Sequence, residues 1–545
     1  MRSTMMDIPL TVTSIMRYGT TVFGDREVVT LAGADGQVRR RSYAEVGGRA
    51  ARLANALRGL GVDADQRVGT FMWNNAEHLE AYLAIPSMGA VLHTLNIRLD
   101  PAEIGYVATH AEDYAVIIDS SLAEKFAEVL PHAPGIKHVI VSGSDFAPAS
   151  VELPGVTVHS YEDLLAAAPG SFDWPELDER SAAAMCYTSG TTGYPKGVVY
   201  SHRSAYLHSM GACLGNAFAL SERDRVLPVV PMFHANAWGL AYAAVMCGAA
   251  LIMPDRYLQP EPLLGLIAAE RVTVAGGVPT IWLGVLSHVR AGGSADLSSI
   301  RLVVCGGSAV PHALQAAFQD EFGVRIVQAW GMTETHPLGS VANVPPGVSE
   351  EDAWKYRDSQ GRLFCTVEGR LGGDDGAVLP SDGVAVGEIE VRGPWVTGSY
   401  HKDDDPAKFH DGWLRTGDVG TLDPQGFIHL TDRAKDVIKS GGEWISSMAL
   451  ENVLMSHPDV AESAVIGVED EKWGERPLAA IVLRPGADVS AVKLREFLGE
   501  HVPRWQLPER WCFVAEIPKT SVGKFSKRTM RDAYLRGDYE VIEAS

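Results

Sequence analysis

The stretch YTSGTTGYPKG, residues Tyr187–Gly197, is the point from which the rest of the chain can be interpreted. It combines four Ser/Thr hydroxyls, three glycines and one lysine, and it follows a small apolar run, Ala182–Cys186, that predicts a buried strand. Glycines let the backbone approach a ligand closely, and exposed N–H groups, hydroxyls and a lysine suit phosphate oxygens. The stretch therefore predicts a loop that grips phosphate.

This loop differs from the one used by the common nucleotide triphosphatases. That loop needs Gly-x-x-x-x-Gly-Lys followed by Ser or Thr. Here Pro195 precedes Lys196 and Gly197 follows it. A flexible surface loop is the alternative, because Gly, Ser and Thr are common in loops. The closing Pro-Lys-Gly directly after an apolar strand is rarer and favours the phosphate loop.

Composition limits the class of protein. The chain has 545 residues, and a single core stops growing at roughly 250–300 residues, so we expect two or more domains. A hydrophobic content of 46% and a charged content of 21% are typical of a soluble globular protein. The net charge of −21 argues against a general nucleic-acid binder, but an acidic protein can still hold a locally positive pocket.

The cysteines and apolar runs indicate a compartment. The six cysteines have no metal or redox spacing, which favours reduced thiols in the cytoplasm. The N-terminus has no apolar run like that of a secretory signal. The longest apolar run, Ala237–Met253, contains glycines and predicts a buried helix, a turn at Cys247-Gly248 and a short strand. We expect a soluble cytoplasmic protein with at most loose membrane association.

Strands alternate with helices through most of the chain. The first examples are a helix over Ser42–Val62, a strand over Val68–Met72, a helix over Asn74–Met88 and a strand over Ala90–Thr94. This order predicts an α/β fold with a parallel sheet covered on both faces. From Gly387 the pattern changes, because the alternation in Gly387–Arg392 predicts a half-exposed strand and a β-rich part.

A shorter α/β stretch follows Asp432. Ser447–His457 predicts a helix, and Val460–Val468 and Leu478–Leu483 predict strands. We therefore place a domain boundary here. It separates an N-terminal domain, residues 1–432, from a small C-terminal domain, residues 433–545.

The loop Tyr187–Gly197 resembles the signature loop of the adenylate-forming superfamily, which comprises acyl-CoA synthetases, luciferases and peptide-synthetase adenylation domains. Six further stretches resemble the superfamily's signatures in the same order, so that the resemblance spans about Ser42 to Lys524. They are Pro231–Gly239, Cys305–Ala309, Gln328–Glu334, Gly412–Asp418, Asp432–Trp444 and Pro518–Lys524. The resemblance implies a large N-terminal domain of parallel α/β subdomains and a β-rich subdomain, followed by a small mobile α+β domain.

The resemblance also implies how ATP and Mg²⁺ are bound. Glu334 would be the magnesium ligand because a hard carboxylate oxygen suits that ion, with Thr188 or, alternatively, Ser189 as the second contact. Ala309 stands where the family often has proline. The implied nucleotide-binding residues are Thr188, Ser189, Gly190, Thr191, Thr192, Gly193, Lys196, Gly307, Ser308, Gln328, Ala329, Trp330, Gly331, Thr333, Asp418 (for the ribose hydroxyls) and Arg433.

Three residues are implied at the reacting and acyl-binding centre. Lys524 would reach the carboxylate and the α-phosphate, where its charge offsets the charge that builds in the transition state. His234 would line the acyl-adenylate site. Trp238 stands where long-chain members carry a tryptophan that gates the acyl tunnel, although a core aromatic is the alternative interpretation.

The small domain contributes further implied positions. Lys435 falls at the family's hinge, and Gly441 and Gly442 resemble the loop that lines the pantetheine passage. Lys439 and Trp444 resemble nucleotide contacts of the long-chain subgroup.

The resemblance implies an ATP-dependent acyl-CoA synthetase for medium- or long-chain fatty acids. Carboxylate, ATP–Mg²⁺ and CoA would give acyl-CoA, AMP and pyrophosphate through an acyl-adenylate. The alternatives are a ligase for a short-chain, thioether or aromatic acid, an adenylation module that loads a carrier protein, and a non-catalytic acyl-nucleotide sensor. A homodimer is compatible with the resemblance to the long-chain subgroup, but no residue pattern tests it.

Overall fold

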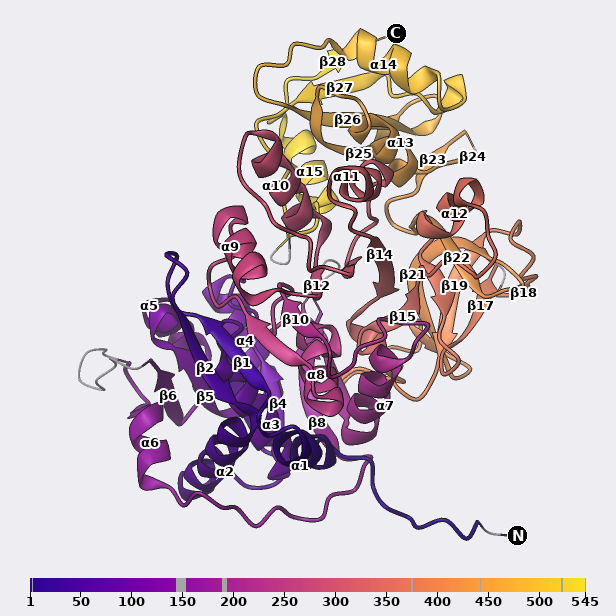
Figure 1. The fold of residues 1–545 in the computed structure, drawn as a ribbon. Coiled ribbons are helices and arrows are strands. Elements are labelled where there is room, and N and C mark those ends of the chain that lie inside the picture. The colour runs from indigo at the N-terminus through magenta and orange to yellow at the C-terminus, as the bar shows by residue number, and fades with distance from the viewer. Residues whose placement is uncertain are drawn as a thin grey trace.

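The computed structural model describes residues 1, 3–143, 153–188, 194–373, 376–441, 443–520 and 523–544. Within these residues the strands form three sheets with helices packed on their faces (Figure 1). We call them the first sheet, the second sheet and the small sheet. No helix in the described part of the chain is long and apolar enough to cross a bilayer.

The first sheet is parallel except at one edge. Its order is β7 (Thr157–Ser160), β6 (His138–Ser142), β5 (Asp113–Asp119), β3 (Arg67–Phe71), β4 (Val91–Thr94), β8 (Ala182–Tyr187) and β9 (Gly197–Ser201). The edge pair β8–β9 is antiparallel, and the predicted phosphate loop joins these two strands. The helices of this part are α2 (Tyr43–Gly59), α3 (Ala76–Ser87), α4 (Pro101–Ala111), α5 (Ala123–Val129), α6 (Tyr161–Ala167) and α7 (His202–Cys213).

The second sheet begins with a parallel half. This half contains β1 (Glu27–Leu31), β11 (Ala250–Met253), β10 (Arg225–Pro228), β12 (Val274–Gly277), β13 (Leu302–Gly306) and β14 (Ile326–Gly331), with β2 (Val38–Ser42) antiparallel at the edge. Its helices are α1 (Val12–Val22), α8 (Leu240–Cys247), α9 (Pro260–Glu270), α10 (Pro279–Arg290) and α11 (His312–Phe322). Fully buried strands such as β11 and β13 explain the apolar runs in the sequence.

The same sheet continues into an antiparallel, β-rich half, drawn in orange in Figure 1. Its strands are β15 (Leu338–Val341), β16 (Gly361–Leu363), β22 (Phe427–Arg433), β21 (Trp413–Leu422), β19 (Gly387–Arg392), β17 (Glu368–Gly372), β18 (Val378–Leu379) and β20 (Phe409–His410), and its helix is α12 (Glu350–Arg357). The β-rich part predicted from Gly387 is therefore present, although it begins earlier, at β15.

The apolar run Ala237–Met253 forms the predicted buried helix, turn and strand. Helix α8 begins at Leu240 and ends at Cys247, and Gly248 follows it with a φ of +75°. A Cβ on Gly248 would lie 2.5 Å from the Phe23 ring, so glycine is required there. The prediction is wrong only at the start, because Ala237 and Trp238 lie in a left-handed turn rather than in the helix.

The small sheet contains β24 (Glu443–Ile445), β23 (Ile438–Ser440), β26 (Gly474–Leu483), β27 (Arg510–Phe513) and β28 (Ile542–Glu543), with β25 (Val460–Asp470) paired to β26. Its helices are α13 (Ser447–Met455), α14 (Ala491–Gly499) and α15 (Lys527–Arg536). It lies beyond α10 and α11 at the top of Figure 1. The chain passes from the second sheet to the small sheet between Arg433 and Ile438.

Candidate active site

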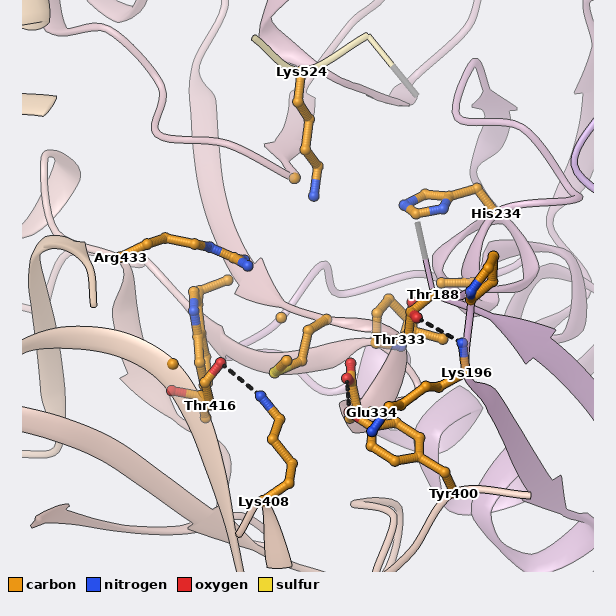
Figure 2. A pocket seen from close by; sticks show the side chains of 18 of the residues that line it. Thr188, Lys196, His234, Thr333, Glu334, Tyr400, Lys408, Thr416, Arg433 and Lys524 are labelled. Atoms are coloured by element: carbon orange, nitrogen blue, oxygen red, sulfur yellow. Dashed lines mark hydrogen bonds between the residues drawn. The ribbon is translucent and has the colours of Figure 1, made fainter. Parts of the chain in front are cut away.

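Within the described residues, two cavities meet where the second sheet faces the small sheet. The large cavity has a volume of about 480 Å³ and the small cavity about 380 Å³. Figure 2 shows the large cavity with Lys524 and Arg433 pointing into it from above and from one side. The residues that line both cavities are Gly307, Ala329, Trp330, Gly331, Arg433, Lys435 and Lys524.

The cavities lie at the carboxyl ends of parallel strands, where α/β sheets commonly bind ligands. Glycines at these ends allow close backbone approach. A Cβ on Gly306 would lie 2.4 Å from the Ala329 carbonyl oxygen, and one on Gly331 would lie 1.7 Å from the Pro337 carbonyl oxygen. Gly307 has a φ of +85° and faces the Lys524 side chain. The glycines predicted at these two strand ends are therefore demanded by packing.

The buried carboxylate of Asp418 links two other predicted nucleotide contacts, Trp330 and Arg433. Trp330 Nε1 donates to Asp418 Oδ2 at 2.7 Å, and Arg433 Nε lies 3.0 Å from Asp418 Oδ1. The pKa of Arg433 is raised, chiefly by the Asp418 charge. Because a carboxylate has about four lone-pair sites, Asp418 can accept further hydrogen bonds from the small cavity, which it lines.

Ser308 and Gln328 also line the small cavity, but the Gln328 side chain is already engaged. Its Oε1 accepts from Val310 N at 2.6 Å, and its Nε2 donates to the Ser359 carbonyl at 2.6 Å. These bonds make the Gln328 amide a brace between β14 and its neighbouring loops.

Lys524 is a partly buried cation at the meeting point of the cavities. Burial, reinforced by Arg433, lowers the pKa of Lys524 to about 8, although Asp418 and Glu334 act in the opposite direction. Among the described residues, no carboxylate lies within ion-pair distance of its ammonium group. The loop that carries it is closed by Thr520 N, which donates to the Lys524 carbonyl. Such a cation is poised to receive an anion.

His234 lines the large cavity and faces Lys524 across it (Figure 2). Burial, with additional repulsion from Lys524 and Arg98, lowers the pKa of His234 to about 3. The imidazole is therefore neutral throughout the physiological range. It can position a ligand by hydrogen bonding but carries no charge.

Two hydrogen bonds join the residues on either side of the predicted phosphate loop. Thr188 N donates to the Lys196 carbonyl at 2.9 Å, and Lys196 N donates to Thr188 Oγ1 at 3.1 Å. The predicted contacts Ser189, Gly190, Thr191, Thr192 and Gly193 lie outside the described residues. Thr188 and Lys196, which these bonds hold together, both line the large cavity.

The Lys196 ammonium group is held by two carboxylates. Its Nζ lies 2.6 Å from Asp405 Oδ2 and 3.0 Å from Asp403 Oδ2, and 4.8 Å from the centre of the Tyr400 ring. Burial lowers the pKa of Lys196, but the hydrogen bonds to Asp405 and Asp403 outweigh it and raise the pKa overall. Any anion that binds this ammonium group would have to compete with these two carboxylates.

Glu334 and Thr333 line the same side of the large cavity. Glu334 is buried, and its Oε1 accepts from the Tyr400 hydroxyl at 2.6 Å (Figure 2). The Thr333 carbonyl accepts from the buried Tyr200 hydroxyl at 2.7 Å. These bonds fix the 3₁₀ turn Thr333–Thr335.

Several cavity residues lie outside the predicted set. His110 Nδ1 is 2.7 Å from the Tyr187 hydroxyl, and Tyr106 packs against Tyr194 with ring centres 4.6 Å apart. Tyr400, His401, Asp403, Asp405 and Lys408 also line the large cavity. The acidic run Asp403–Asp405 is visible in the sequence, but nothing near it in the chain indicates Lys196 as its partner.

The apolar end of the large cavity is formed by a strained turn. Residues Ala235–Trp238 have φ values of 44–56°, and Gly239 has 72°. A left-handed conformation costs roughly 1–2 kcal/mol per residue with a Cβ. The turn is held by buried contacts: Cys186 Sγ lies 3.0 Å from Asn236 Oδ1, and Met232 N donates to Asn74 Oδ1 at 2.7 Å. This geometry directs Trp238 to the cavity wall.

Three predicted positions lie away from both cavities. Lys439, Gly441 and Trp444 belong to the exposed hairpin β23–β24. A Cβ on Gly441, whose φ is +60°, would lie 2.7 Å from the Trp473 ring. Gly442 lies outside the described residues. Lys435, by contrast, sits in the connection between the two sheets and lines both cavities.

Comparison with known proteins agrees with this arrangement. A family model described as AMP-binding enzyme matches residues 19–401, and the model of the AMP-binding enzyme C-terminal domain matches residues 449–524. The chain belongs to the AMP-binding enzyme family.

Its relatives include acyl-CoA ligases that match almost end to end. The chain is 42% identical to the medium-chain-fatty-acid–CoA ligase of Ectopseudomonas oleovorans, over 99% of each chain. It is 43% identical to the long-chain-fatty-acid–CoA ligase of Thermus thermophilus, over 98% of this chain and 97% of that protein. It is 42% identical to the 3-methylmercaptopropionyl-CoA ligase of Ruegeria lacuscaerulensis, over 97% of this chain and 98% of that protein.

A solved structure shares the fold. The anthranilate CoA ligase AuaEII in complex with anthranoyl-AMP superposes with a TM-score of 0.87 at 26% identity, over 98% of this chain and 99% of that one. This AMP-binding enzyme thus has the adenylate-forming fold expected from its motifs. It is an acid–thiol ligase that uses ATP and CoA and forms an acyl-adenylate.

Proposed function

We propose that this AMP-binding enzyme activates a medium- or long-chain fatty acid. The observation that carries the proposal is a set of apolar side chains in the wall of the large cavity, which His234 also lines. The side chains that form it are Phe218, Ala235, Trp238, Pro337 and Leu338. An apolar wall favours an alkyl chain because its burial contributes about 0.8 kcal/mol per CH₂ group. The fatty-acid–CoA ligases among the relatives support the same substrate class.

In the first half-reaction, a carboxylate oxygen attacks the α-phosphorus of ATP and pyrophosphate leaves. Lys524 would hold the carboxylate and the α-phosphate together and offset the negative charge of the transition state. Arg433 would contact the ribose and phosphate, while Asp418 would accept the ribose hydroxyls. Neutral His234 would orient the carboxylate without competing for the charge of Lys524.

The outer phosphates would lie at the opposite wall, among Thr188, Thr333 and Lys196. Lys196 would leave Asp403 and Asp405 to bind the departing pyrophosphate. The undescribed loop residues Ser189–Gly193 belong to the same proposed phosphate contact. Catalysis of this kind depends mainly on positioning and electrostatics.

The donor set fits Mg²⁺. That ion is usually held by one or two carboxylates together with substrate phosphates. Glu334 supplies one buried carboxylate at the cavity wall, and Thr188 supplies a hydroxyl, whereas no cluster of three or more His, Cys, Asp or Glu occurs in the described residues. We propose these two residues as the magnesium contacts, with Ser189 as an alternative. The bound ion would neutralise triphosphate charge.

In the second half-reaction, the thiol of CoA attacks the acyl carbonyl and AMP leaves. The exposed hairpin with Lys439, Gly441 and Trp444 would then serve CoA or nucleotide only after movement of the small sheet. We propose that residues 1–432 and 433–545 are the two domains and that Lys435 is their hinge. We also propose a cytoplasmic location, which the scattered thiols support.

A thioether acid is the second candidate. It is favoured by the 42% identity to the 3-methylmercaptopropionyl-CoA ligase. Such an acid would fill only the part of the apolar end nearest His234.

A substrate series tests the proposal. Pyrophosphate release and CoA-dependent AMP release would be measured with straight-chain acids of increasing length and with 3-methylmercaptopropionate. We expect kcat/KM to rise with chain length into the medium or long range, and we expect Trp238→Ala to shift that optimum. A maximum at the thioether acid would favour the second candidate. Pyrophosphate release without CoA-dependent AMP release would contradict acyl-CoA synthesis.

A further inference from the structure

Two cysteines far apart in the sequence meet at the ends of neighbouring helices. Cys213 is the last residue of α7 and Cys247 the last residue of α8, and Figure 1 shows these helices side by side. Cys213 Sγ lies 3.9 Å from the Ala243 carbonyl oxygen, and Cys247 Sγ lies 3.8 Å from the Ala244 carbonyl oxygen. The sulfurs thus contact consecutive carbonyls of one helix, which brings the two thiols to the same place on the molecule.

The exposure of these thiols distinguishes them from the other cysteines. Cys213 and Cys247 are partly exposed, whereas Cys186, Cys305 and Cys512 are buried. The residues directly after Cys213, from Leu214 to Asn216, are exposed, which opens the pair to small molecules in solution. Cys365 is exposed at a different place on the molecule. The chain therefore contains an accessible thiol pair and an accessible separate thiol for comparison.

The two thiols affect each other unequally. The neighbouring Cys213 thiol lowers the pKa of Cys247 against the opposing effect of burial. The neighbouring Cys247 thiol raises the pKa of Cys213, and burial acts in the same direction. Because the thiolate is the nucleophile in disulfide exchange, Cys247 would react first.

We propose that Cys213 and Cys247 form a reversible, redox-sensitive disulfide that ties α7 to α8. The Cys247 thiolate attacks one sulfur of a disulfide oxidant such as oxidised glutathione and displaces a glutathione thiolate. Cys213 then loses its proton and attacks the Cys247 sulfur of this mixed disulfide, displacing the second glutathione. Two electrons pass from the protein thiols to the oxidant, and the two protons are taken up by the released thiolates.

The disulfide would act on the apolar part of the wall of the large cavity. Phe218 follows Cys213 after a short loop, and its N–H donates to the Ala212 carbonyl at 3.3 Å. Trp238 lies in the strained turn directly before α8. Both side chains line the large cavity. A disulfide would restrict the relative movement of these two walls and so disfavour the longest acids; this consequence, unlike the disulfide itself, depends on the proposed function.

The chemical test uses the full-length protein in a Cys365→Ser background. After incubation with oxidised glutathione, we expect the native protein to lose the Cys213 and Cys247 thiols, retain no glutathione, and yield a linked 213–247 peptide by mass spectrometry. Dithiothreitol should restore both thiols. In the matched Cys213→Ser variant, glutathione should remain on Cys247. Two free thiols, or glutathione retained on either cysteine of the intact pair, would overturn the proposal.

The functional test repeats the acid series before and after oxidation. We expect a greater loss of kcat/KM for the longest acids than for the shortest, with recovery in dithiothreitol and no change in a variant that carries both Cys213→Ser and Cys247→Ser. An unchanged series in protein that contains the disulfide would overturn the effect on the cavity walls. The mass-spectrometric result is independent of activity, so a wrong substrate class and a wrong disulfide would be told apart.

Discussion

Two lysines face the same large cavity in opposite electrostatic states. Lys524 is partly buried where the second sheet meets the small sheet, and the loss of solvent around it lowers its pKa to about 8. Lys196, at the phosphate end, has a side chain that is 37% exposed and is ion-paired with Asp405 and Asp403. Its pKa is raised.

The difference supports the proposal that Lys524, rather than Lys196, acts at the reacting centre. A cation without a partner in a low-dielectric site is costly until an anion arrives, so Lys524 is best suited to a charge that develops there. Lys196 already has anionic partners, so phosphate binding replaces one interaction with another. The resemblance had implied Lys524 at the reacting centre and Lys196 among the nucleotide contacts, and the different surroundings of the two lysines support these proposed roles.

Replacing Lys524 should have the largest effect. We expect Lys524→Ala to lower the adenylation rate by about 10²–10³-fold, the range seen when one transition-state donor is removed. Thioester formation from supplied acyl-adenylate should fall much less. Pyrophosphate release and acyl-CoA formation measure the two steps separately. Lys519→Ala is the matched control. Lys519 lies in the same stretch, Pro518–Lys524, but it is ion-paired with Glu462 of β25. Equal losses in both steps would contradict the assignment.

Replacing Lys196 should have a smaller effect. We expect Lys196→Ala to lower kcat/KM for ATP by about tenfold, equivalent to about 1.4 kcal/mol, because solvent screens a partly exposed cation. Inhibition by added pyrophosphate should weaken in parallel. The measurement is initial rate against ATP and pyrophosphate concentration. A loss as large as that of Lys524→Ala would erase the distinction between the two lysines.

The pH dependence should separate the lysines without removing either side chain. Lys524 is protonated below its pKa of about 8 and loses its charge above it. The value of kcat/KM for ATP in adenylation should therefore fall as pH rises through about 8. Lys196, whose pKa is raised, should stay charged in this range. Lys524→Arg should abolish the fall, and persistence of the same inflection in that variant would exclude Lys524 as its source.

The smallest effect concerns the partners of Lys196. We expect Asp405→Asn to lower KM for ATP by up to about threefold, because it removes a competing anion worth under about 1 kcal/mol. The amide oxygen can still accept from Lys408 N, as Asp405 Oδ1 does at 3.2 Å. Asp403→Asn, at the longer contact, should change KM less. The gain should vanish in the Asp405→Asn, Lys196→Ala double variant, and an equal gain there would contradict competition for Lys196.

Much of the site could be predicted because each motif is local. Thr188, Trp330, Glu334, Arg433 and Lys524 come from separate motifs and all line the large cavity, and the ligand contact of each stays a prediction. Asp418, from another of these motifs, lines the small cavity. The helix and the following turn in the apolar run Ala237–Met253 were also predictable, because an uninterrupted apolar segment indicates a buried helix and Gly248 marks its end.

Other features depended on contacts that no local pattern contains. Tyr400 binds Glu334, His110 binds Tyr187, and Cys213 meets Cys247 only after distant segments pack together. The left-handed turn at Ala235–Trp238 could not be predicted either, because its residues with a Cβ disfavour that conformation and tertiary contacts enforce it.

By itself the sequence determined the family, the alternation of strands and helices, and the order of the motifs along the chain, since these depend on residue type and short spacing. The tertiary structure decided which charges meet. Among the residues that the structure describes, it left Lys524 without a carboxylate at ion-pair distance and gave Lys196 two. Burial and long-range neighbours set the state of a lysine, and residue type and spacing alone do not contain them.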